Sequence, residues 1–193
     1  MVMELVKAAY RPSELMALLK IKFGGKVPKD YPEPLETLAL KLGDREFCYA
    51  ALNRVSRSFA VVIQQLPEEL KDPVCVFYLV LRGLDSVEDD MTYAAEKRLP
   101  LLRSFYLKSY DANWNIKGVG DSDDYRTLLA NYHKVNSLFL SLDERYQKVI
   151  ADICCKMGNG MADYAEKKVN TLTDYDNYCH YVAGLVGIGL SSL

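Results

Sequence analysis

The sequence shows almost no sign of β-structure. It has no sustained alternation of apolar and polar residues, and no Asn-Gly turn joins two β-branched runs. Apolar residues recur instead at helical spacing, and helix start signals precede them. These absences argue against sheet-based folds, so the sequence predicts an all-α protein.

The chain also lacks the features of a membrane-spanning, secreted or nucleic-acid-binding protein. Its longest apolar runs, 74–81 and 181–190, are much shorter than the roughly 20 residues of a membrane helix. Acidic Glu4 and Glu14 interrupt residues 1–25, so no secretory signal is visible. A formal net charge of −2 provides no basic field for nucleic acid. We therefore expect no nucleic-acid partner, and membrane anchoring only through a C-terminal segment missing from this sequence.

Paired cysteine motifs are absent as well. None of the cysteines forms a C-x-x-C pair, and neither His133 nor His180 has zinc-ligand spacing around it. The five cysteines are Cys48, Cys75, Cys154, Cys155 and Cys179. An odd, unpaired set predicts free thiols and a reducing compartment.

Capping residues divide the chain into successive predicted helices. One helix is expected from Asp44 to about Gln65, and the next from an N-cap and first-turn proline at Asp72-Pro73 to about Met91. Further helix starts are expected at Thr92, at Asp121 or Ser122, at a Ser141–Glu144 capping box, and at Thr173. We expect one helical domain over residues 1–193, with 1–43 peripheral. The last helix is still apolar at Leu193, so we expect a longer protein.

An acidic cluster at the end of an apolar helix is the sharpest chemical signal. Asp85, Glu88 and Asp89 are spaced i, i+3, i+4, which places like charges on one face and at the unfavourable end of the helix. The preceding run 74–81 is apolar on all sides, which indicates an interior helix. A divalent cation would stabilise the cluster, since Mg²⁺ takes one or two carboxylates together with substrate phosphates. The alternative is a solvated acidic helix end.

A basic segment upstream could provide the partner for an anion. Arg54, Arg57 and Ser58 lie on one predicted helix face, with Ser56 and Phe59 beside them. The guanidinium group offers fixed donors that suit diphosphate oxygens, and Arg82 would join this set. The alternative is a set of surface arginines engaged in ordinary salt bridges.

The last predicted helix combines glycines with an apolar stripe. Its glycines, each weakening a helix by roughly 1 kcal/mol relative to alanine, are Gly184, Gly187 and Gly189. They indicate a neighbouring helix, or a long apolar ligand, packed close to the backbone. The stripe at i, i+4 spacing is Tyr178, Val182, Val186 and Leu190. A tyrosine at the head of an apolar groove could handle a proton or stabilise a cation.

Several segments together resemble the squalene synthase family. They are 56–59, 77–82, 84–92, 149–154, 157–162 and 178–190, in the family's order and spacing. The resemblance implies an isoprenoid-synthase helical bundle around a central cavity, where two aspartate-rich motifs hold Mg²⁺ against substrate diphosphates. The second motif lies downstream in the family and is absent here, so we expect no turnover from these 193 residues alone. Formation of squalene by this chain would refute that expectation.

The resemblance also implies residue roles. Asp85, Glu88 and Asp89 match the first motif, as metal ligands, with Asp85 and Asp89 contributing to catalysis. Tyr178 matches the catalytic tyrosine that handles a proton. Arg57 and Arg82 match residues near the diphosphate and the NADPH phosphates. The expected substrate-binding positions are Ser56, Ser58, Phe59, Tyr78, Val182, Val186 and Leu190.

The implied reaction joins two farnesyl diphosphates head to head into presqualene diphosphate, which NADPH then reduces to squalene for sterol biosynthesis. The expected setting is the cytosolic face of the endoplasmic reticulum membrane, and the expected state is a monomer. Two alternatives stay open. One is a phytoene- or dehydrosqualene-type synthase without reduction. The other is a non-catalytic helical module that binds lipid.

Overall fold

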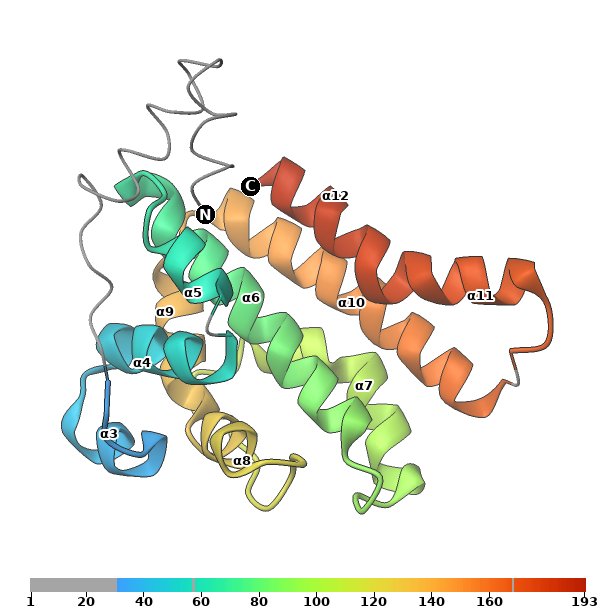
Figure 1. The fold of residues 1–193 in the computed structure, drawn as a ribbon, viewed down its shortest axis with the longest axis horizontal. Coiled ribbons are helices and arrows are strands. Elements are labelled where there is room, and N and C mark those ends of the chain that lie inside the picture. The colour runs from blue at the N-terminus through green and yellow to red at the C-terminus, as the bar shows by residue number, and fades with distance from the viewer. Residues whose placement is uncertain (1–30, 57, 168) are drawn as a thin grey trace, which may run out of the picture.

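The computed structural model describes residues 31–56, 58–167 and 169–193, and every regular element in these ranges is helical. The prediction of an all-α fold is therefore confirmed. In chain order the helices are α3 (Leu35–Lys41), α4 (Asp44–Ser56), α5 (Ser58–Ile63), α6 (Glu68–Asp89), α7 (Ala95–Lys108), α8 (Asp123–Ala130), α9 (Tyr132–Ser141), α10 (Glu144–Glu166), α11 (Leu172–Cys179), the π-helix η2 (His180–Gly184) and α12 (Leu185–Ser192) (Figure 1).

Helix α6 lies at the centre of the bundle. It packs against α4, α5, α7, α8, α9 and α10. Cys75, Val76 and Leu79 are fully buried within it, as are Leu84 and Val87 nearer its C-terminus. The apolar run of the sequence is thus an interior helix, as predicted. Helix α10 also packs against η2 and α12, which lie along it (Figure 1).

The start of α6 differs from the prediction. The helix begins at Glu68, and Pro73 lies inside it instead of in its first turn. Asp72 does not cap a helix, because its carboxylate accepts hydrogen bonds from Arg45 Nε (2.9 and 3.1 Å) and from the Tyr49 hydroxyl (2.6 Å). The prediction of an N-cap at Asp72 was wrong, since the Asp72 side chain instead links α6 to α4 through these hydrogen bonds.

The single helix predicted from Asp44 to Gln65 is two helices. In Figure 1, α5 runs in a different direction from α4. No proline or glycine marks this change in the sequence. Local bonds offer a reason: the Ser56 hydroxyl donates to Leu52 O (2.8 Å) and the Ser58 hydroxyl donates to Ser56 O (3.3 Å). Such bonds from serine to the backbone compete with the helix and bend it.

One cap prediction is confirmed and one is wrong around the long loop that precedes α8. Ser122 caps α8, and its hydroxyl oxygen accepts the Tyr125 backbone N–H (3.4 Å). Thr92 does not cap α7, which begins at Ala95. The Thr92 hydroxyl and backbone N–H both donate to one oxygen of Asp90, at 2.6 and 2.9 Å.

Two further caps are displaced by two residues from their predicted places. The cap of α10 is Asp143 instead of Ser141, and its carboxylate accepts the Arg145 backbone N–H. The cap of α11 is Thr171 instead of Thr173, and it forms a capping box with Asp174. In both cases the sequence offers two capping residues close together, and local spacing does not decide between them.

The prediction of free thiols is confirmed for all five cysteines, of which Cys48, Cys75 and Cys154 are buried. No helix within the described ranges is long and apolar enough to cross a membrane. Contacts of α3 with α4 and α8 attach the start of the described chain to the bundle. The boundaries of the predicted single domain stay a prediction, because residues 1–30 lie outside the described part.

Candidate active site

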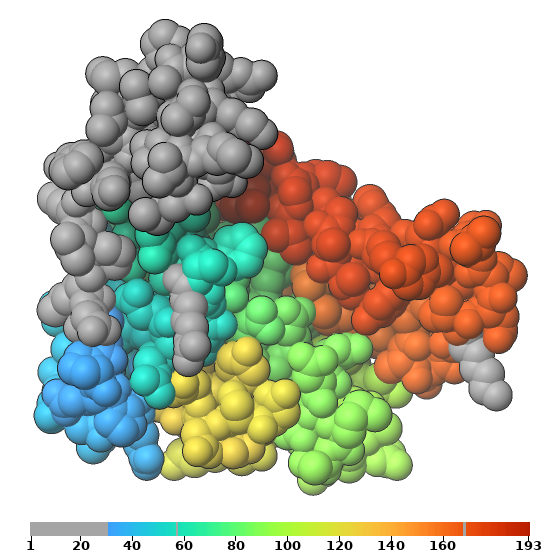
Figure 2. Space-filling model, viewed as in Figure 1, coloured from blue at the N-terminus to red at the C-terminus, as the bar shows by residue number. Residues whose placement is uncertain are grey.

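A cavity of about 510 Å³ lies between α5, α6, η2 and α12. Arg82 and Asp85 provide its charged groups, and nearly all the other lining side chains are apolar. In Figure 2 the green atoms of α6 are visible between the yellow α8 and the red-orange α11 and α12. The arrangement suits an elongated apolar molecule that carries a charged group at one end.

The cavity brings together residues that are far apart in the sequence. From the predicted site it collects Phe59, Tyr78, Arg82, Asp85, Val182, Val186 and Leu190. Five other predicted site residues lie outside its lining, namely Ser56, Ser58, Glu88, Asp89 and Tyr178. The Ser56 hydroxyl is already bonded to the backbone of its own helix. Arg57 lies outside the described residues, so its predicted role is untested.

Arg82 faces the acidic end of α6 and two aromatic rings. Its Nη1 lies 3.6 Å from an Asp85 carboxylate oxygen, and its Nη2 donates to the Tyr78 hydroxyl at 3.4 Å. The guanidinium carbon lies 5.8 Å from the centre of the Tyr78 ring and 5.5 Å from that of Tyr125. Its buried Nε has no hydrogen-bond partner among the described residues. A buried donor without a partner is costly, so Arg82 retains donor capacity for an anion.

The carboxylates at the end of α6 are held in an unfavourable setting. Burial raises the pKa of Asp85 to about 6, against the opposing effect of Arg82, and Asp89 raises it further. Burial also raises the pKa of Glu88 to about 7, with added repulsion from Asp89 and then Asp85. A cation beside these groups would relieve both effects. The donor set therefore fits a hard divalent ion such as Mg²⁺.

The carboxylate cluster is not a complete metal cage. Within residues 31–56, 58–167 and 169–193, no three acidic, histidine or cysteine side chains converge closely enough to hold a metal ion by themselves. Mg²⁺ usually keeps several waters and takes one or two carboxylates, with substrate phosphates as its other ligands. The fit is therefore to a metal shared with a ligand, which leaves the roles of Asp85, Glu88 and Asp89 as predictions.

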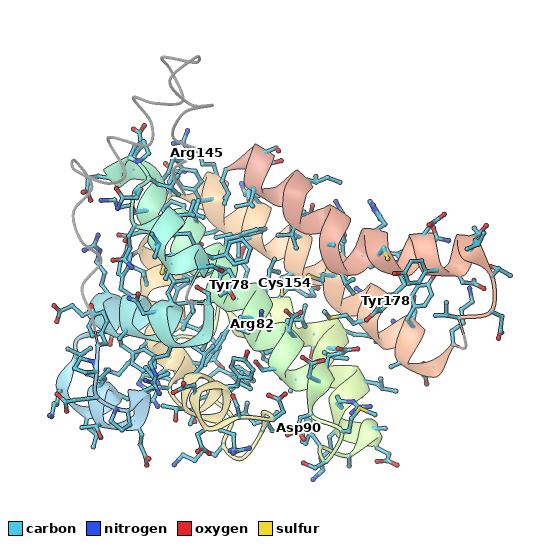
Figure 3. The ribbon with its side chains drawn as sticks, viewed as in Figure 1. Tyr78, Arg82, Asp90, Arg145, Cys154 and Tyr178 are labelled. Atoms are coloured by element: carbon cyan, nitrogen blue, oxygen red, sulfur yellow. The ribbon has the colours of Figure 1, made fainter. Side chains whose placement is uncertain are left out.

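Tyr178 lies on α11 (Figure 3), within reach of the charges of the acidic cluster. Its ring packs against Tyr164 of α10, with ring centres 5.6 Å apart. Burial raises the pKa of Tyr178, and the negative charges of Glu88, Asp89 and Asp85 raise it further. The hydroxyl is thus within electrostatic reach of the carboxylates and keeps its proton.

The π-helix η2 lies within the predicted stripe that begins at Tyr178. Val182, Val186 and Leu190 line the cavity at i, i+4 spacing, as the sequence indicates. The wider turn of η2 lies between Tyr178 and Val186. Tyr178 is not among the residues that line the cavity, and its place at the head of the groove stays a prediction. π-turns of this kind are frequent at functional sites.

The glycines of this segment have different surroundings. A Cβ at Gly189 would lie 2.5 Å from Phe77 Cζ of α6, whereas a Cβ at Gly187 would have no atom within 4 Å. A Cβ at Gly160 of α10 would overlap the Tyr181 ring. The predicted close approach is therefore confirmed at Gly189, where the partner is a neighbouring helix.

The sequence did not predict the role of Asp90, which immediately follows the acidic cluster. Only 4% of Asp90 is exposed, and its second carboxylate oxygen accepts the Gly120 backbone N–H at 2.9 Å. Its backbone carbonyl accepts Arg98 Nη1 at 3.0 Å. The Thr92 hydroxyl and the Gly120 and Thr92 backbone N–H groups lower the pKa of Asp90 against the effect of burial. Asp90 therefore holds the loop before α8 against the end of α6. In the sequence Asp90 looks like another member of the acidic cluster, so its structural role could not be distinguished from the roles of Asp85, Glu88 and Asp89.

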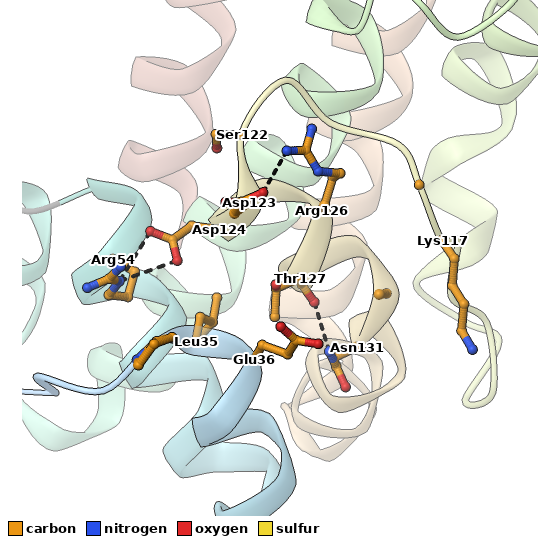
Figure 4. A pocket seen from close by; sticks show the side chains of 13 residues that line it. Leu35, Glu36, Arg54, Lys117, Ser122, Asp123, Asp124, Arg126, Thr127 and Asn131 are labelled. Carbon is orange, nitrogen blue, oxygen red and sulfur yellow. Dashed lines mark hydrogen bonds and ion pairs between the residues drawn. The ribbon is translucent and has the colours of Figure 1, made fainter.

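A second, more open pocket of about 750 Å³ lies between α3, α4 and α8 (Figure 4). Its charged groups are largely paired with one another. Arg54 Nε bonds both oxygens of Asp124, and Arg126 bonds Asp123. Arg54, which the sequence grouped with the possible anion ligands, is thus a structural salt bridge between α4 and α8. This pocket is lined mainly by polar and charged side chains and lacks the apolar wall of the first.

Together, the all-helical bundle, the apolar cavity and the carboxylates beside an arginine define the class of helical prenyl synthases. The chain belongs to the squalene/phytoene synthase family, whose family model, "Squalene/phytoene synthase", matches residues 52–193.

Known relatives agree with this assignment. The chain is 53% identical to squalene synthase BSS of Botryococcus braunii, over 97% of this chain and 39% of that protein. It is 46% identical to the squalene synthase of Homo sapiens, over 99% of this chain and 45% of the relative. A solved complex of TcSQS with the ligand BPH1237 is 52% identical, with a TM-score of 0.75, over 77% of this chain and 43% of that one. The chain thus spans about two fifths of the length of these relatives.

Proposed function

We propose that the end of α6 binds the diphosphate group of an allylic prenyl substrate, while the cavity takes the hydrocarbon chain. Asp85, Glu88 and Asp89 would hold Mg²⁺ against the diphosphate, and Arg82 would donate to its oxygens. The observation that supports this most is that Arg82 and Asp85 meet an apolar wall in one and the same cavity. Neither a surface acidic patch nor a purely apolar pocket would combine these features.

The proposed reaction is the head-to-head condensation of two farnesyl diphosphates to presqualene diphosphate. When bound, Mg²⁺ would neutralise charge on the departing diphosphate. Arg82 stabilises the same developing charge through its guanidinium donors. The apolar side chains of α5, α6 and α12 keep water away from the allylic cation, because water would otherwise react with the cation.

Tyr178 is proposed to handle the proton that is lost as the cyclopropane ring closes. Its hydroxyl is the titratable group of α11 that the acidic cluster influences most directly, through Glu88, Asp89 and Asp85. The ring of Tyr164, on α10, packs against the Tyr178 ring. The predicted contributions of Ser56, Ser58 and Arg57 to substrate and cofactor binding are proposed on family likeness alone.

The second half-reaction is proposed to yield squalene, with NADPH as the donor of hydride. This step rests on the relatives, since those named above are squalene synthases. Of the two arginines proposed for the NADPH phosphates, Arg82 faces Asp85 and Arg57 lies outside the described residues. Sterol biosynthesis at the endoplasmic reticulum membrane, and a monomeric state, are proposed on the same likeness.

Product analysis tests this proposal in the protein expressed from its complete reading frame. With farnesyl diphosphate and Mg²⁺ alone we expect presqualene diphosphate, and with NADPH added we expect squalene. If the condensed hydrocarbon that accumulates in the presence of NADPH has not taken up hydride, the result would favour a phytoene- or dehydrosqualene-type synthase. An Asp89→Ala variant should lose the first product while keeping its helical circular dichroism. A variant that retains full product formation would contradict the metal-binding role.

A further inference from the structure

The backbone of α12 approaches α6 closely at Gly189. A Cβ there would lie 2.5 and 2.8 Å from Cζ and Cε2 of Phe77, and 3.0 Å from Cγ1 of Ile153 on α10. Real Cβ atoms are not found at the first two of these distances from another heavy atom, so the Phe77 ring would have to move. Ile153 is buried beside it, which restricts movement towards α10.

Phe77 is also part of the cavity wall. It precedes Asp85 by eight residues on the same helix, so it lies about 12 Å from it along the helix axis. The cavity extends beyond Phe77 to Leu70 of α6, Leu66 and Leu193. The ring therefore borders the middle of the cavity, between its charged end and its apolar far end.

We propose that the contact between Gly189 and Phe77 determines how long an apolar chain the cavity accepts. Glycine at 189 lets the Phe77 ring rest against α12, which keeps the middle of the cavity open. Any side chain at 189 pushes the ring into the cavity and closes the path to the far end. The identity of the natural chain as a prenyl group rests on the proposed function, but the constriction itself does not.

Three prenyl alcohols that differ by one isoprene unit each provide the probe: geraniol, farnesol and geranylgeraniol. They carry no diphosphate, so their affinities report the cavity without the metal site. Isothermal titration should show that Gly189→Ala weakens binding of farnesol and geranylgeraniol by at least about tenfold, the usual effect of lost fit in an apolar pocket. Geraniol, which ends before the constriction, should change by less than about threefold.

Gly187→Ala is the matched control. It adds the same methyl group to the same helix, and its Cβ would have no atom within 4 Å. Both substitutions raise helix propensity equally, so only the contact with Phe77 separates them. The control should bind all three alcohols as the unsubstituted protein does.

A second variant tests the partner residue. Phe77→Leu should increase the affinity for geranylgeraniol relative to that for farnesol. Combined with Gly189→Ala, it should restore farnesol binding. If Gly189→Ala does not fold, Phe77→Leu alone decides, and an unchanged preference overturns the inference. Equal weakening of all three alcohols by Gly189→Ala, or binding of none by the unsubstituted protein, overturns it as well.

The proposed function fails on a different measurement. If farnesyl diphosphate gains no affinity from Mg²⁺ while the alcohols follow the expected order, the metal site is refuted and the constriction stands. If Mg²⁺ strengthens diphosphate binding but the alcohols do not discriminate Gly189→Ala from Gly187→Ala, the constriction alone is refuted.

Discussion

Replacing Asp85 by asparagine should stabilise the metal-free protein at neutral pH. Burial raises the pKa of Asp85 from 3.8 to about 6. Between these values the folded state binds more protons than the unfolded state, so the free energy of unfolding falls as the pH rises. Above about pH 6 the whole cost of the charged carboxylate is present. Asparagine keeps the shape and removes the charge.

The size of the effect follows from the shift in pKa. A difference of roughly two units corresponds to about 3 kcal/mol, which already includes the favourable effect of Arg82. About a quarter of the side chain, 26%, is exposed, and the asparagine amide has its own cost of burial. We therefore expect a gain of about 1–2 kcal/mol, or a rise in Tm of roughly 2–8 °C for a chain of this size.

Urea unfolding in the presence of EDTA, at pH 5 and at pH 8, measures this effect. The difference between Asp85→Asn and the unsubstituted protein should be larger at pH 8 than at pH 5. Asp152→Asn is the control, because Asp152 forms an exposed pair with Lys156 and should change stability by less than about 0.5 kcal/mol. A destabilised Asp85→Asn variant at pH 8 would refute the reasoning that the site is strained without a cation.

Three further variants test other parts of the structure. Tyr178→Phe should lower presqualene diphosphate formation by about two orders of magnitude with unchanged substrate affinity; near-normal output would count against its role. Asp72→Ala removes the partner of the Tyr49 hydroxyl and should cost about 1–3 kcal/mol in urea unfolding, and no loss would show that the tie between α4 and α6 is weak. Gly160→Ala should displace the Tyr181 ring, lowering Tm and changing the near-ultraviolet circular dichroism; an unchanged spectrum would contradict the close packing.

Helical periodicity sufficed to predict the fold class and the interior position of α6. A run without a polar face has to be covered on all sides, so its burial follows from composition. The helix ends were less predictable. Asp72 followed by proline is a strong local start signal, but the tertiary bonds of Asp72 to Arg45 and Tyr49 compete with it. Local propensity is a weak prior wherever such contacts form.

The site was predictable in its parts and not in its geometry. The spacing of Asp85, Glu88 and Asp89 already contains the electrostatic conflict that the structure shows. The π-helix η2 between Tyr178 and Val186 could not be predicted, because no particular residue type marks it in the sequence. The structural role of Asp90 depends on Gly120, thirty residues away, and no local pattern reports it.

The most direct test of the central claim is the Mg²⁺ dependence of diphosphate binding. Calorimetry of the protein from its complete reading frame with a non-hydrolysable farnesyl thiodiphosphate should show affinity at least about tenfold higher with Mg²⁺ than with EDTA. Asp85→Asn should remove that gain without lowering the affinity in EDTA, because it takes away a negative charge beside the diphosphate. Equal affinity with and without Mg²⁺, or a gain that survives in Asp85→Asn, would contradict the assignment of the acidic end of α6 as the metal and diphosphate site.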